Sequence, residues 1–405
     1  MSFFVLVFLY ALALGGFALA LFLALEVAAA LFDEEEKAPL QAAHVGPVVV
    51  VIPAHNEAKS IAPTLRNATS QLRDMDRLLV VADNCADETA RIARENGAEV
   101  IERHDPEHRG KGYALQFALD HLRDAPPDIV VFTDADCLFA PEALQRVSGV
   151  ASRHDRPAQA LYLMKAPDGA GPRLRVAEFA WSFINNARMR GLARLFDVTR
   201  FTGAGFAAPW RVVGGLDLAS GEIVEDLALT MTLIRKGAAP IFAPDALVTS
   251  EFPMDDEALT RQSARWSIGS MTYAARQGFS ALFEGLAKGR FAQIGAAIDL
   301  MIPPLTIFAA LLIAITALSL LAWLAWGVSG AFQLSVWSLF LTGATIAGAW
   351  FRFGREALPP SALGGVIAFL LSKASVFGRK GRESAQTWTP TRDGSNHGGH
   401  SKEGE

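Results

Sequence analysis

The chain has 405 residues, which is enough for one large domain together with membrane segments. About half of the residues (51%) are hydrophobic and the mean hydropathy is positive, which is unusual for a wholly soluble enzyme of this length. The formal net charge of −5 gives no electrostatic support for binding nucleic acid, so no nucleic-acid partner is expected.

The first element is an apolar segment at the N-terminus. Residues 2–25 carry no charged side chain and are numerous enough to span a bilayer. We predict a transmembrane helix within residues 1–32, after which the acidic run 33–36 returns the chain to water. A signal peptide is the alternative, but the segment lacks a basic start and exceeds the usual length of a signal-peptide core.

Between residues 45 and 257, short apolar segments alternate with helical ones. We expect strands at 47–52, 77–82, 99–101 and 129–133, and helices at 60–72, 87–96 and 112–122. This alternation predicts an α/β fold with a mostly parallel sheet. Ligands of such sheets bind beyond the carboxyl ends of the strands. The polar residues at those ends are His55, Asn56, Glu57, Asp83, Asn84, Asp134 and Asp136.

Two carboxylates, Asp134 and Asp136, follow the last of these strands with one residue between them. They repel each other, and a divalent cation that also binds a diphosphate would offset the repulsion. The alternative is a solvated turn or the N-cap of the next helix, because a bare DxD pattern is common.

Three further groups of residues give only weak evidence of function when each is taken alone. Asp83 can accept hydrogen bonds from a base or ribose, or it can form a turn or helix cap. The segment 109–112 suits phosphate through its glycines and Lys111, but it does not match the P-loop pattern and could be an ordinary basic loop. Glu225 and Asp226 open a predicted helix, where acidic residues also complement the helix dipole.

A later segment, 258–299, is predicted to form amphipathic helices on the membrane surface. It carries Gln262, Arg265 and Trp266 at spacings that place them on one helix face. The segment 173–195 is amphipathic as well. We expect four aromatic residues of these helices to lie at the membrane interface: Trp181, Phe183, Trp266 and Tyr273.

The C-terminal part of the chain returns to the membrane. Two apolar segments separated by a glycine turn predict a transmembrane hairpin over 300–352. A third segment, 357–378, contains two prolines and has basic residues on both sides, which favours an interfacial or re-entrant helix over a fourth span. The polar tail, 379–405, is expected to be cytoplasmic and largely disordered.

Taken together, in order and in spacing, these motifs resemble those of membrane-bound family 2 glycosyltransferases, the group that includes cellulose and poly-N-acetylglucosamine synthases. The matching residues are Val51–Glu57, Asp83, Arg109–Leu115, Asp134, Asp136, Phe201–Phe206, Glu225, Asp226, the QxxRW motif Gln262–Trp266, and Trp388–Arg392. The chain departs from the family at Val224, where a TED-type motif has threonine. The resemblance implies a GT-A type fold with a Rossmann-like sheet.

The resemblance also implies a role for each matched residue. Asp226 would be the catalytic base, with Glu225 beside it. The nucleotide-sugar donor would be bound by Pro53, His55, Glu57, Asp83, Lys111, Asp134, Gln262, Arg265 and Trp266. The metal, Mg²⁺ or Mn²⁺, would be held by Asp136 with Asp134. The acceptor would lie against Gly203, Ala204, Gly205 and Trp266.

These implications predict an inverting, metal-dependent hexosyltransferase of cell-envelope or exopolysaccharide biosynthesis. It would transfer a hexose or N-acetylhexosamine from a nucleotide sugar, with UDP favoured by the family, to a lipid-linked or membrane-proximal saccharide. A processive polysaccharide synthase is the alternative, because QxxRW is typical of polymerising members, but three spans are few for a polymer channel. A non-catalytic membrane scaffold and a nucleotidyltransferase are more remote alternatives.

Cysteine usage and charge predict where the protein lies. Cys85 and Cys137 form neither a disulfide framework nor a zinc-ligand pattern, which fits a reducing compartment. We therefore expect a multi-pass protein of the inner (plasma) membrane with its catalytic domain in the cytoplasm. Besides the donor and acceptor, the expected partners are membrane lipid and either a second copy of the chain or other envelope-biosynthesis proteins.

Overall fold

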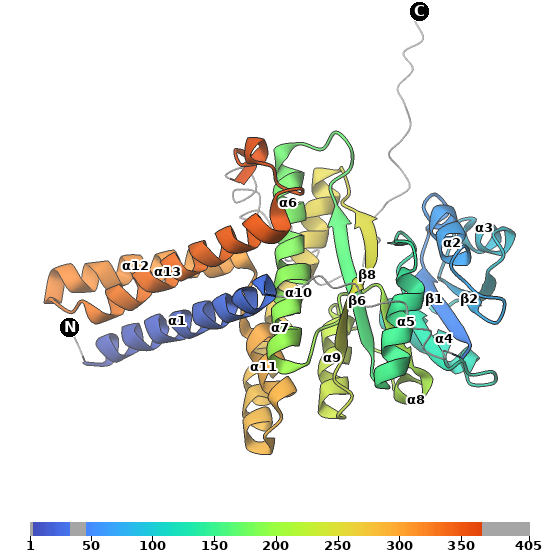
Figure 1. Cartoon of the computed structure of the whole chain (residues 1–405), viewed down its shortest axis with the longest axis horizontal. Coiled ribbons are helices and arrows are strands. Elements are labelled where there is room, and N and C mark those ends of the chain that lie inside the picture. The colour runs from blue at the N-terminus through green and yellow to red at the C-terminus, as the bar shows by residue number, and fades with distance from the viewer. Residues whose placement is uncertain (1–2, 33–45, 367–405) are drawn as a thin grey trace, which may run out of the picture.

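The computed structural model describes residues 3–32 and 46–366, and it consists of an α/β body from which three long helices extend (Figure 1). Eight strands form one sheet in the order β3-β2-β1-β4-β7-β6-β8-β5. Their bounds are β1 Val48–Ala54, β2 Arg77–Asp83, β3 Glu99–Arg103, β4 Ile129–Phe132, β5 Leu138–Phe139, β6 Ala158–Lys165, β7 Phe206–Pro209 and β8 Ile241–Glu251.

The first four strands pair in parallel, as the sequence predicts. They are joined by the helices α2 (Ile61–Thr69), α3 (Thr89–Glu95) and α4 (Lys111–Leu122). Residues Val48–Ile52 are buried along their whole length because both faces of the sheet are covered. The predicted α/β fold with a mostly parallel sheet is therefore confirmed.

The other half of the sheet changes direction. β7 pairs antiparallel with both β4 and β6, β6 pairs parallel with β8, and β5 pairs antiparallel with β8. Phe206 on β7 stacks on Phe132 and Phe201, which fixes the reversed strand against the parallel half. The helices of this half are α5 (Ala143–His154), α8 (Trp210–Val213) and α9 (Glu225–Arg235).

Long helices connect the body to the protruding bundle. The first is continuous through α6 (Pro172–Ser182), the π-helical segment η1 (Phe183–Arg188) and α7 (Met189–Phe196). The second is α10 (Asp256–Lys288), which turns at Gly289 into α11 (Phe291–Met301). In Figure 1, α6 and α7 run across the base of the bundle, in front of α10.

The aromatic residues of these helices do not lie where we expected. Phe183 and Tyr273 are buried, at 2% and 6% exposure. Trp181 and Trp266 pack against each other, with 4.8 Å between their ring centroids. The prediction that these four residues meet the membrane interface is therefore wrong for the two buried ones, because an amphipathic helix covers a protein core as readily as a bilayer.

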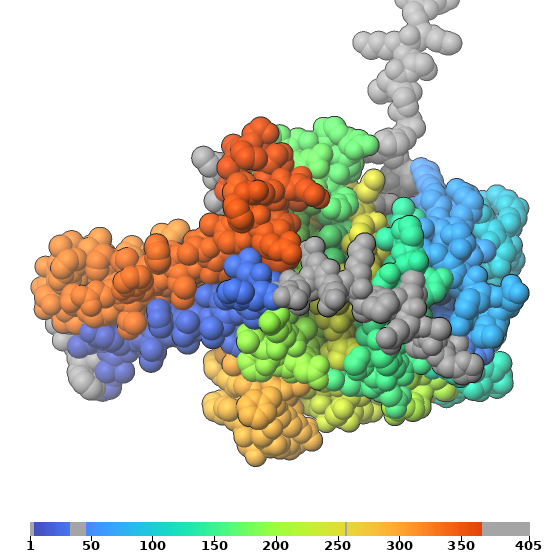
Figure 2. Space-filling model, viewed as in Figure 1, coloured from blue at the N-terminus to red at the C-terminus, as the bar shows by residue number. Residues whose placement is uncertain are grey.

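The bundle consists of α1 (Phe3–Leu31), α12 (Leu305–Trp326) and α13 (Gly330–Ala349), which continues into η2 (Trp350–Gly354). Within the described residues, these three helices are long and apolar enough to cross a membrane. Figure 2 shows the bundle standing clear of the body. Its large apolar side chains are exposed, among them Phe8 (63%), Leu324 (72%) and Phe340 (64%).

The C-terminal boundaries differ from those expected. The second bundle helix begins at Leu305 rather than near residue 300, because Pro303 and Pro304 separate it from α11. A short 3₁₀ helix, η3 (Pro360–Ala362), follows the bundle. Residues 367–378 of the predicted 357–378 segment and the tail 379–405, with its Trp388–Arg392 motif, lie outside the described residues.

Candidate active site

A cavity of about 1080 Å³ lies beyond the carboxyl ends of β1, β2 and β4. Most of the residues that the sequence singled out line it. They are Pro53, His55, Glu57, Asp83, Lys111, Asp134, Asp136, Gly203, Glu225, Asp226, Gln262, Arg265 and Trp266. Ala204 and Gly205 do not line the cavity: Ala204 is fully buried, and a Cβ added to Gly205 would lie 2.8 Å from the Val248 side chain.

The ends of β1 and β2 form one wall of the cavity. Asp83 is buried, and its carboxylate accepts hydrogen bonds from Arg103 (2.7 Å) and Asn84 (2.9 Å). The ring Nδ1 of His55 lies 2.6 Å from the backbone carbonyl of Asp83, which fixes the imidazole at the strand end. Arg103, on β3, holds Asp83 in place and was not among the residues that the sequence pointed to.

Lys111, at the start of α4, connects two motifs that are distant in sequence. Its ammonium group donates to the carboxylate of Asp134 and, at 2.6 Å, to the carbonyl of Gly203. Burial lowers the pKa of Lys111, but the negative charges of Asp134 and Glu225 outweigh it and raise the pKa above its ordinary value. A charged amine therefore lies between the expected donor side and the expected acceptor side of the cavity.

Asp134 and Asp136 offer a small set of hard oxygen ligands. In the parts of the chain that the structure describes, no three His, Cys, Asp or Glu side chains form a group that could hold a metal ion. Burial raises the pKa of the neighbouring Cys137 thiol well above its ordinary range, so it is a poor metal ligand. Two carboxylates without further protein ligands fit Mg²⁺ or Mn²⁺, which can take the remaining ligands from a diphosphate and water.

Glu225 and Asp226 lie at the N-terminus of α9, and both line the cavity. Burial and the adjacent charge of Asp226 raise the pKa of Glu225 to about 7. Burial also raises the pKa of Asp226, although a hydrogen bond from the backbone N–H of Leu227 (2.8 Å) opposes the shift. Two adjacent acids with raised pKa values are suited to accepting a proton near neutral pH.

The raised pKa of Glu225 predicts a pH-dependent penalty on stability. A carboxyl whose pKa is higher in the folded state stabilises the fold at low pH, and that contribution is lost as pH rises from about 4.5 towards about 7. Glu225→Gln removes the penalty, so we expect it to stabilise the protein by about 1–3 kcal/mol at pH 8 and little at pH 4. Thermal unfolding of both proteins in detergent at the two pH values measures this, and equal shifts at both would contradict it.

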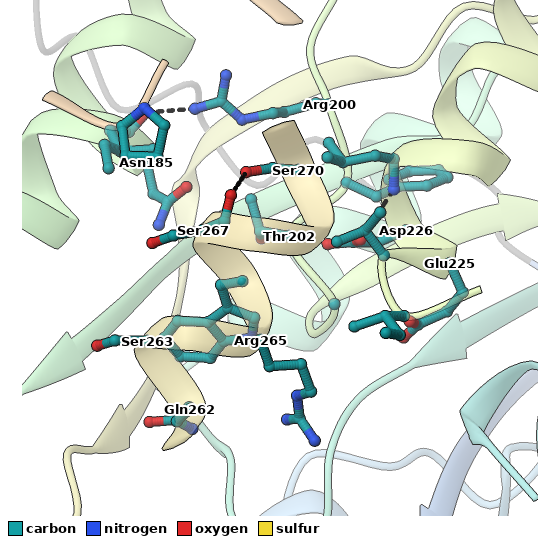
Figure 3. Close-up of a pocket in the computed structure, with 18 of the residues that line it drawn as sticks. Asn185, Arg200, Thr202, Glu225, Asp226, Gln262, Ser263, Arg265, Ser267 and Ser270 are labelled. Atoms are coloured by element: carbon teal, nitrogen blue, oxygen red, sulfur yellow. Dashed lines mark hydrogen bonds between the residues drawn. The ribbon is translucent and has the colours of Figure 1, made fainter. Parts of the chain in front are cut away.

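The helix α10 carries the QxxRW residues along the cavity (Figure 3). Figure 3 shows Arg265 and Gln262 on one turn of this helix, with Glu225 and Asp226 on a separate wall. Burial lowers the pKa of Arg265, while the charges of Glu225, Asp134 and Asp226 oppose that shift. The buried Oε1 of Gln262 has no hydrogen-bond partner within the described structure and is available to a ligand.

Another group of charged residues lies beside the cavity, where the bundle meets the body, and was not predicted from the sequence. Arg188, on η1, is hydrogen-bonded to Glu26 of α1 and to Asp299 of α11, and Arg200 is also paired with Asp299. The side chains of Glu26, Arg188 and Asp299 are buried, and that of Arg200 is 13% exposed. The sequence contained one indication, because Glu26 and Asp299 are isolated acids within apolar helices.

Comparison with known proteins places this geometry in a family. The model of the family described as "Glycosyltransferase like family 2" matches residues 46–269. The low-salt glycan biosynthesis hexosyltransferase of Haloferax volcanii is 37% identical over 108 residues, covering 26% of this chain and 25% of that protein. The 4,4'-diaponeurosporenoate glycosyltransferase of Staphylococcus aureus is 35% identical over 95 residues, covering 23% and 24%. The chain thus spans about a quarter of the length of these curated relatives.

A solved structure extends the likeness to almost the whole chain. The mannosyltransferase from Pyrobaculum calidifontis, in complex with GDP-Man and Mn²⁺, has a TM-score of 0.53 and is 21% identical. The match covers 91% of this chain and 98% of that one. At this identity the likeness shows the fold alone, and it confirms the GT-A type fold that the motifs implied.

Proposed function

This chain belongs to glycosyltransferase-like family 2, and we propose that it transfers a hexose or N-acetylhexosamine from a nucleotide sugar to an acceptor at the membrane surface. One observation carries the proposal. A single cavity brings together strand-end carboxylates, the charged Lys111, two partly buried acids of α9 and the Gln262–Trp266 face of α10. These groups provide, in one place, what binding a diphosphate and removing a proton require.

The proposed reaction needs no covalent intermediate with the enzyme. Asp226 accepts the proton of an acceptor hydroxyl, and the acceptor oxygen attacks the anomeric carbon of the donor sugar. The bond from that carbon to the diphosphate breaks on the opposite face, so the configuration inverts. Lys111 and Arg265 both line the cavity, and in the proposed reaction they offset the charge of the departing nucleoside diphosphate. When Glu225 is protonated, it places no negative charge beside Asp226.

The carboxylates of Asp136 and Asp134 are the groups that would hold a divalent cation. Such a cation, when bound, stabilises negative charge on the leaving diphosphate as a Lewis acid. Asp134 and Asp136 line the cavity on the side of Asp83. Arg103 fixes the carboxylate of Asp83, which in this proposal contacts the base or ribose. Pro53, His55 and Glu57 complete the proposed donor side.

The location at the membrane rests on the three-helix bundle. Its exposed apolar surface is what a bilayer would cover. Arg352 and Arg355 follow the last bundle helix, and basic residues at that end favour a cytoplasmic body. Cys85 and Cys137 are unpaired thiols, as in a reducing compartment. We therefore propose a multi-pass inner-membrane protein with the sheet domain in the cytoplasm.

We propose transfer of one sugar, or a few, rather than synthesis of a secreted polymer. A channel for a polysaccharide needs a polar lumen lined by several helices, and the described chain contributes three span-capable helices with apolar outer surfaces. A channel completed by further copies of the chain is the alternative. The length of the product separates the two, since single transfer gives one discrete adduct and processive synthesis gives a long ladder.

The test is a screen of nucleotide sugars with the purified full-length protein in lipid vesicles, with and without Mn²⁺ or Mg²⁺, scored by nucleoside diphosphate release. We expect release from at least one donor, and a loss of about 10²-fold or more in Asp136→Asn. The exposed carboxylate Asp74 provides a matched control, and Asp74→Asn should retain full activity. Failure of every donor with every metal would refute the enzyme assignment.

A further inference from the structure

The cavity is larger than a single small ligand requires, and its far end is apolar. Its volume of about 1080 Å³ lies above the usual range of about 300–1000 Å³ for one ligand. We call this far end the membrane-side arm, defined by Leu23, Ile184, Leu192, Met301, Pro304 and Thr306. These residues come from α1, η1, α7, α11, the loop after it and α12, so the arm lies at the foot of the bundle.

The charged side chains next to this arm neutralise one another. Arg188 donates through Nε to Glu26 (3.0 Å) and through Nη2 to the carboxylate and carbonyl of Asp299. Arg200 donates to the other carboxylate oxygen of Asp299 and to the carbonyl of Ile184 (2.9 Å). Two guanidinium groups thus meet two carboxyl groups, so each guanidinium already has an acidic partner.

Neutral amides and hydroxyls also line the cavity near the arm and α10. Asn185, Thr202, Ser267 and Ser270 all line the cavity. Figure 3 shows Ser267 and Ser270 on α10, with Asn185 and Asp226 on opposite sides of this helix in that view. The buried Oγ1 of Thr202 has no hydrogen-bond partner within the described structure. A hydroxyl or amide can both donate and accept, so these groups suit a neutral polar head that does the same.

The end of the cavity that contains Glu225 and Asp226 does not favour an anionic acceptor. Glu225 and Asp226 are adjacent, partly buried carboxyls. Of the cations that act on them, Lys111 is engaged by Asp134, Arg200 is paired with Asp299, and Arg265 is assigned to the departing diphosphate. A phosphate or carboxylate acceptor would bring a further negative charge to this point without an excess of positive charge to receive it. Such an acceptor also needs no base, because its oxygen is already deprotonated at neutral pH. A hydroxyl, by contrast, needs one.

We propose that the acceptor is a neutral lipid with a free hydroxyl, whose apolar chain lies in the membrane-side arm and whose polar head meets Asn185, Thr202 and Asp226. This inference rests on the proposed glycosyltransferase function and specifies its acceptor. The hydroxyl proton passes to Asp226, the new bond joins the acceptor oxygen to the anomeric carbon, and the bond to the diphosphate breaks. The product is a neutral glycoside rather than a sugar phosphodiester or ester.

Matched lipid pairs test the head group. The full-length protein is incubated with the donor found in the screen and vesicles containing dioleoylglycerol, glucosyl-dioleoylglycerol, farnesol, or the matched anions dioleoyl phosphatidic acid, farnesyl phosphate and oleate. We expect the neutral lipids to be preferred by about 10²-fold or more in kcat/KM. Preferred glycosylation of the anionic lipids, or of none of the lipids, would overturn the inference.

A parallel reaction avoids dependence on the choice of lipid. Radiolabelled donor is incubated with the protein and a total lipid extract of the cells that express it. We expect labelled lipid that passes through an anion exchanger and resists mild acid. Labelled lipid that binds the exchanger and releases sugar in mild acid, or label found only in water-soluble products, contradicts the proposal.

Filling the membrane-side arm with a larger side chain tests whether the acyl chain of the acceptor lies there. Thr306 lines the arm, whereas its neighbour Ile307 does not, so Thr306→Trp and Ile307→Trp form a matched pair on one helix. We expect Thr306→Trp to raise KM for dioleoylglycerol by about tenfold or more while leaving KM for dibutyrylglycerol nearly unchanged. Ile307→Trp should change neither. Equal effects of the two variants, or of one variant on long and short chains, would place the acyl chain elsewhere.

The outcomes also separate this inference from the function on which it rests. Donor turnover with a water-soluble or anionic acceptor would support the glycosyltransferase function and refute the neutral-lipid acceptor. The absence of turnover with any donor, together with the absence of donor binding in a thermal-shift assay, removes both.

Discussion

Asp226→Asn is expected to lower kcat/KM for sugar transfer by about 10²–10⁴-fold while leaving donor binding nearly unchanged. The substitution keeps the size of the side chain and its hydrogen bond from the backbone N–H of Leu227, so the helix start should persist. What it removes is the ability to accept a proton from the acceptor. The rate of nucleoside diphosphate release and the donor Kd, measured on the same preparation, test both halves of this expectation.

The neighbouring acid supplies the control. Glu225→Gln removes a group of nearly the same burial and charge, but the proposed base remains, so the loss should be smaller than in Asp226→Asn. Near-normal transfer by Asp226→Asn, combined with a large loss in Glu225→Gln, would assign the base to Glu225. If both variants transfer normally, the reaction does not depend on a base at the start of α9.

The strands that the sequence predicted most clearly, β1, β2 and β4, are those with continuous apolar runs. The run Val48–Ile52 is apolar and β-branched throughout, which leaves few alternatives to a central parallel strand. The antiparallel half has no comparable local pattern. β5 has two residues, β7 ends in Pro209, and β8 contains a proline and an aspartate beside a register shift at Ala160. These strands are specified by their neighbours rather than by their own periodicity.

The site residues also fall into those that a local sequence pattern predicted and those that it did not. Strand ends brought Asp83, Asp134 and Asp136 to one edge, as the α/β pattern predicts. The sequence alone did not distinguish the role of Gly203 from that of Gly205. Gly203 lines the cavity, whereas Gly205 has a positive φ of 71° and an added Cβ would lie 2.8 Å from the Val248 side chain, so its role is in packing.

The isolated acids at the foot of the bundle were visible in the sequence, but their pairing with Arg188 and Arg200 could not be predicted, because these residues are spread over most of the chain. Glu26, Arg188 and Asp299 come from three helices that no local pattern relates. Yet the contact joins the apolar bundle to the same cavity that holds the proposed base. Through Arg200, which directly precedes the Phe201–Phe206 loop, it also reaches the expected acceptor side. The bundle therefore helps to shape the site as well as to anchor it.

Arg188→Met is accordingly expected to destabilise the protein by about 3–5 kcal/mol, because it leaves the buried carboxylate of Glu26 without its charged partner. Asp299 keeps Arg200 and loses only one of its two partners. The free energy of unfolding can be measured by denaturant titration of the full chain in detergent micelles. Arg211→Met, at an exposed ion pair with Asp155, makes the same chemical change and should lie within about 1 kcal/mol of the parent.

The double variant Glu26→Leu/Arg188→Met distinguishes a buried charge from a general packing defect. It removes both members of the pair and leaves Arg200 and Asp299 together, so most of the lost stability should return. A coupling energy near zero between the two positions would show that the ion pair does not hold α1 to η1. If stability returns but acceptor KM stays raised, the pair also positions the acceptor side, because α1 contributes Leu23 to the membrane-side arm.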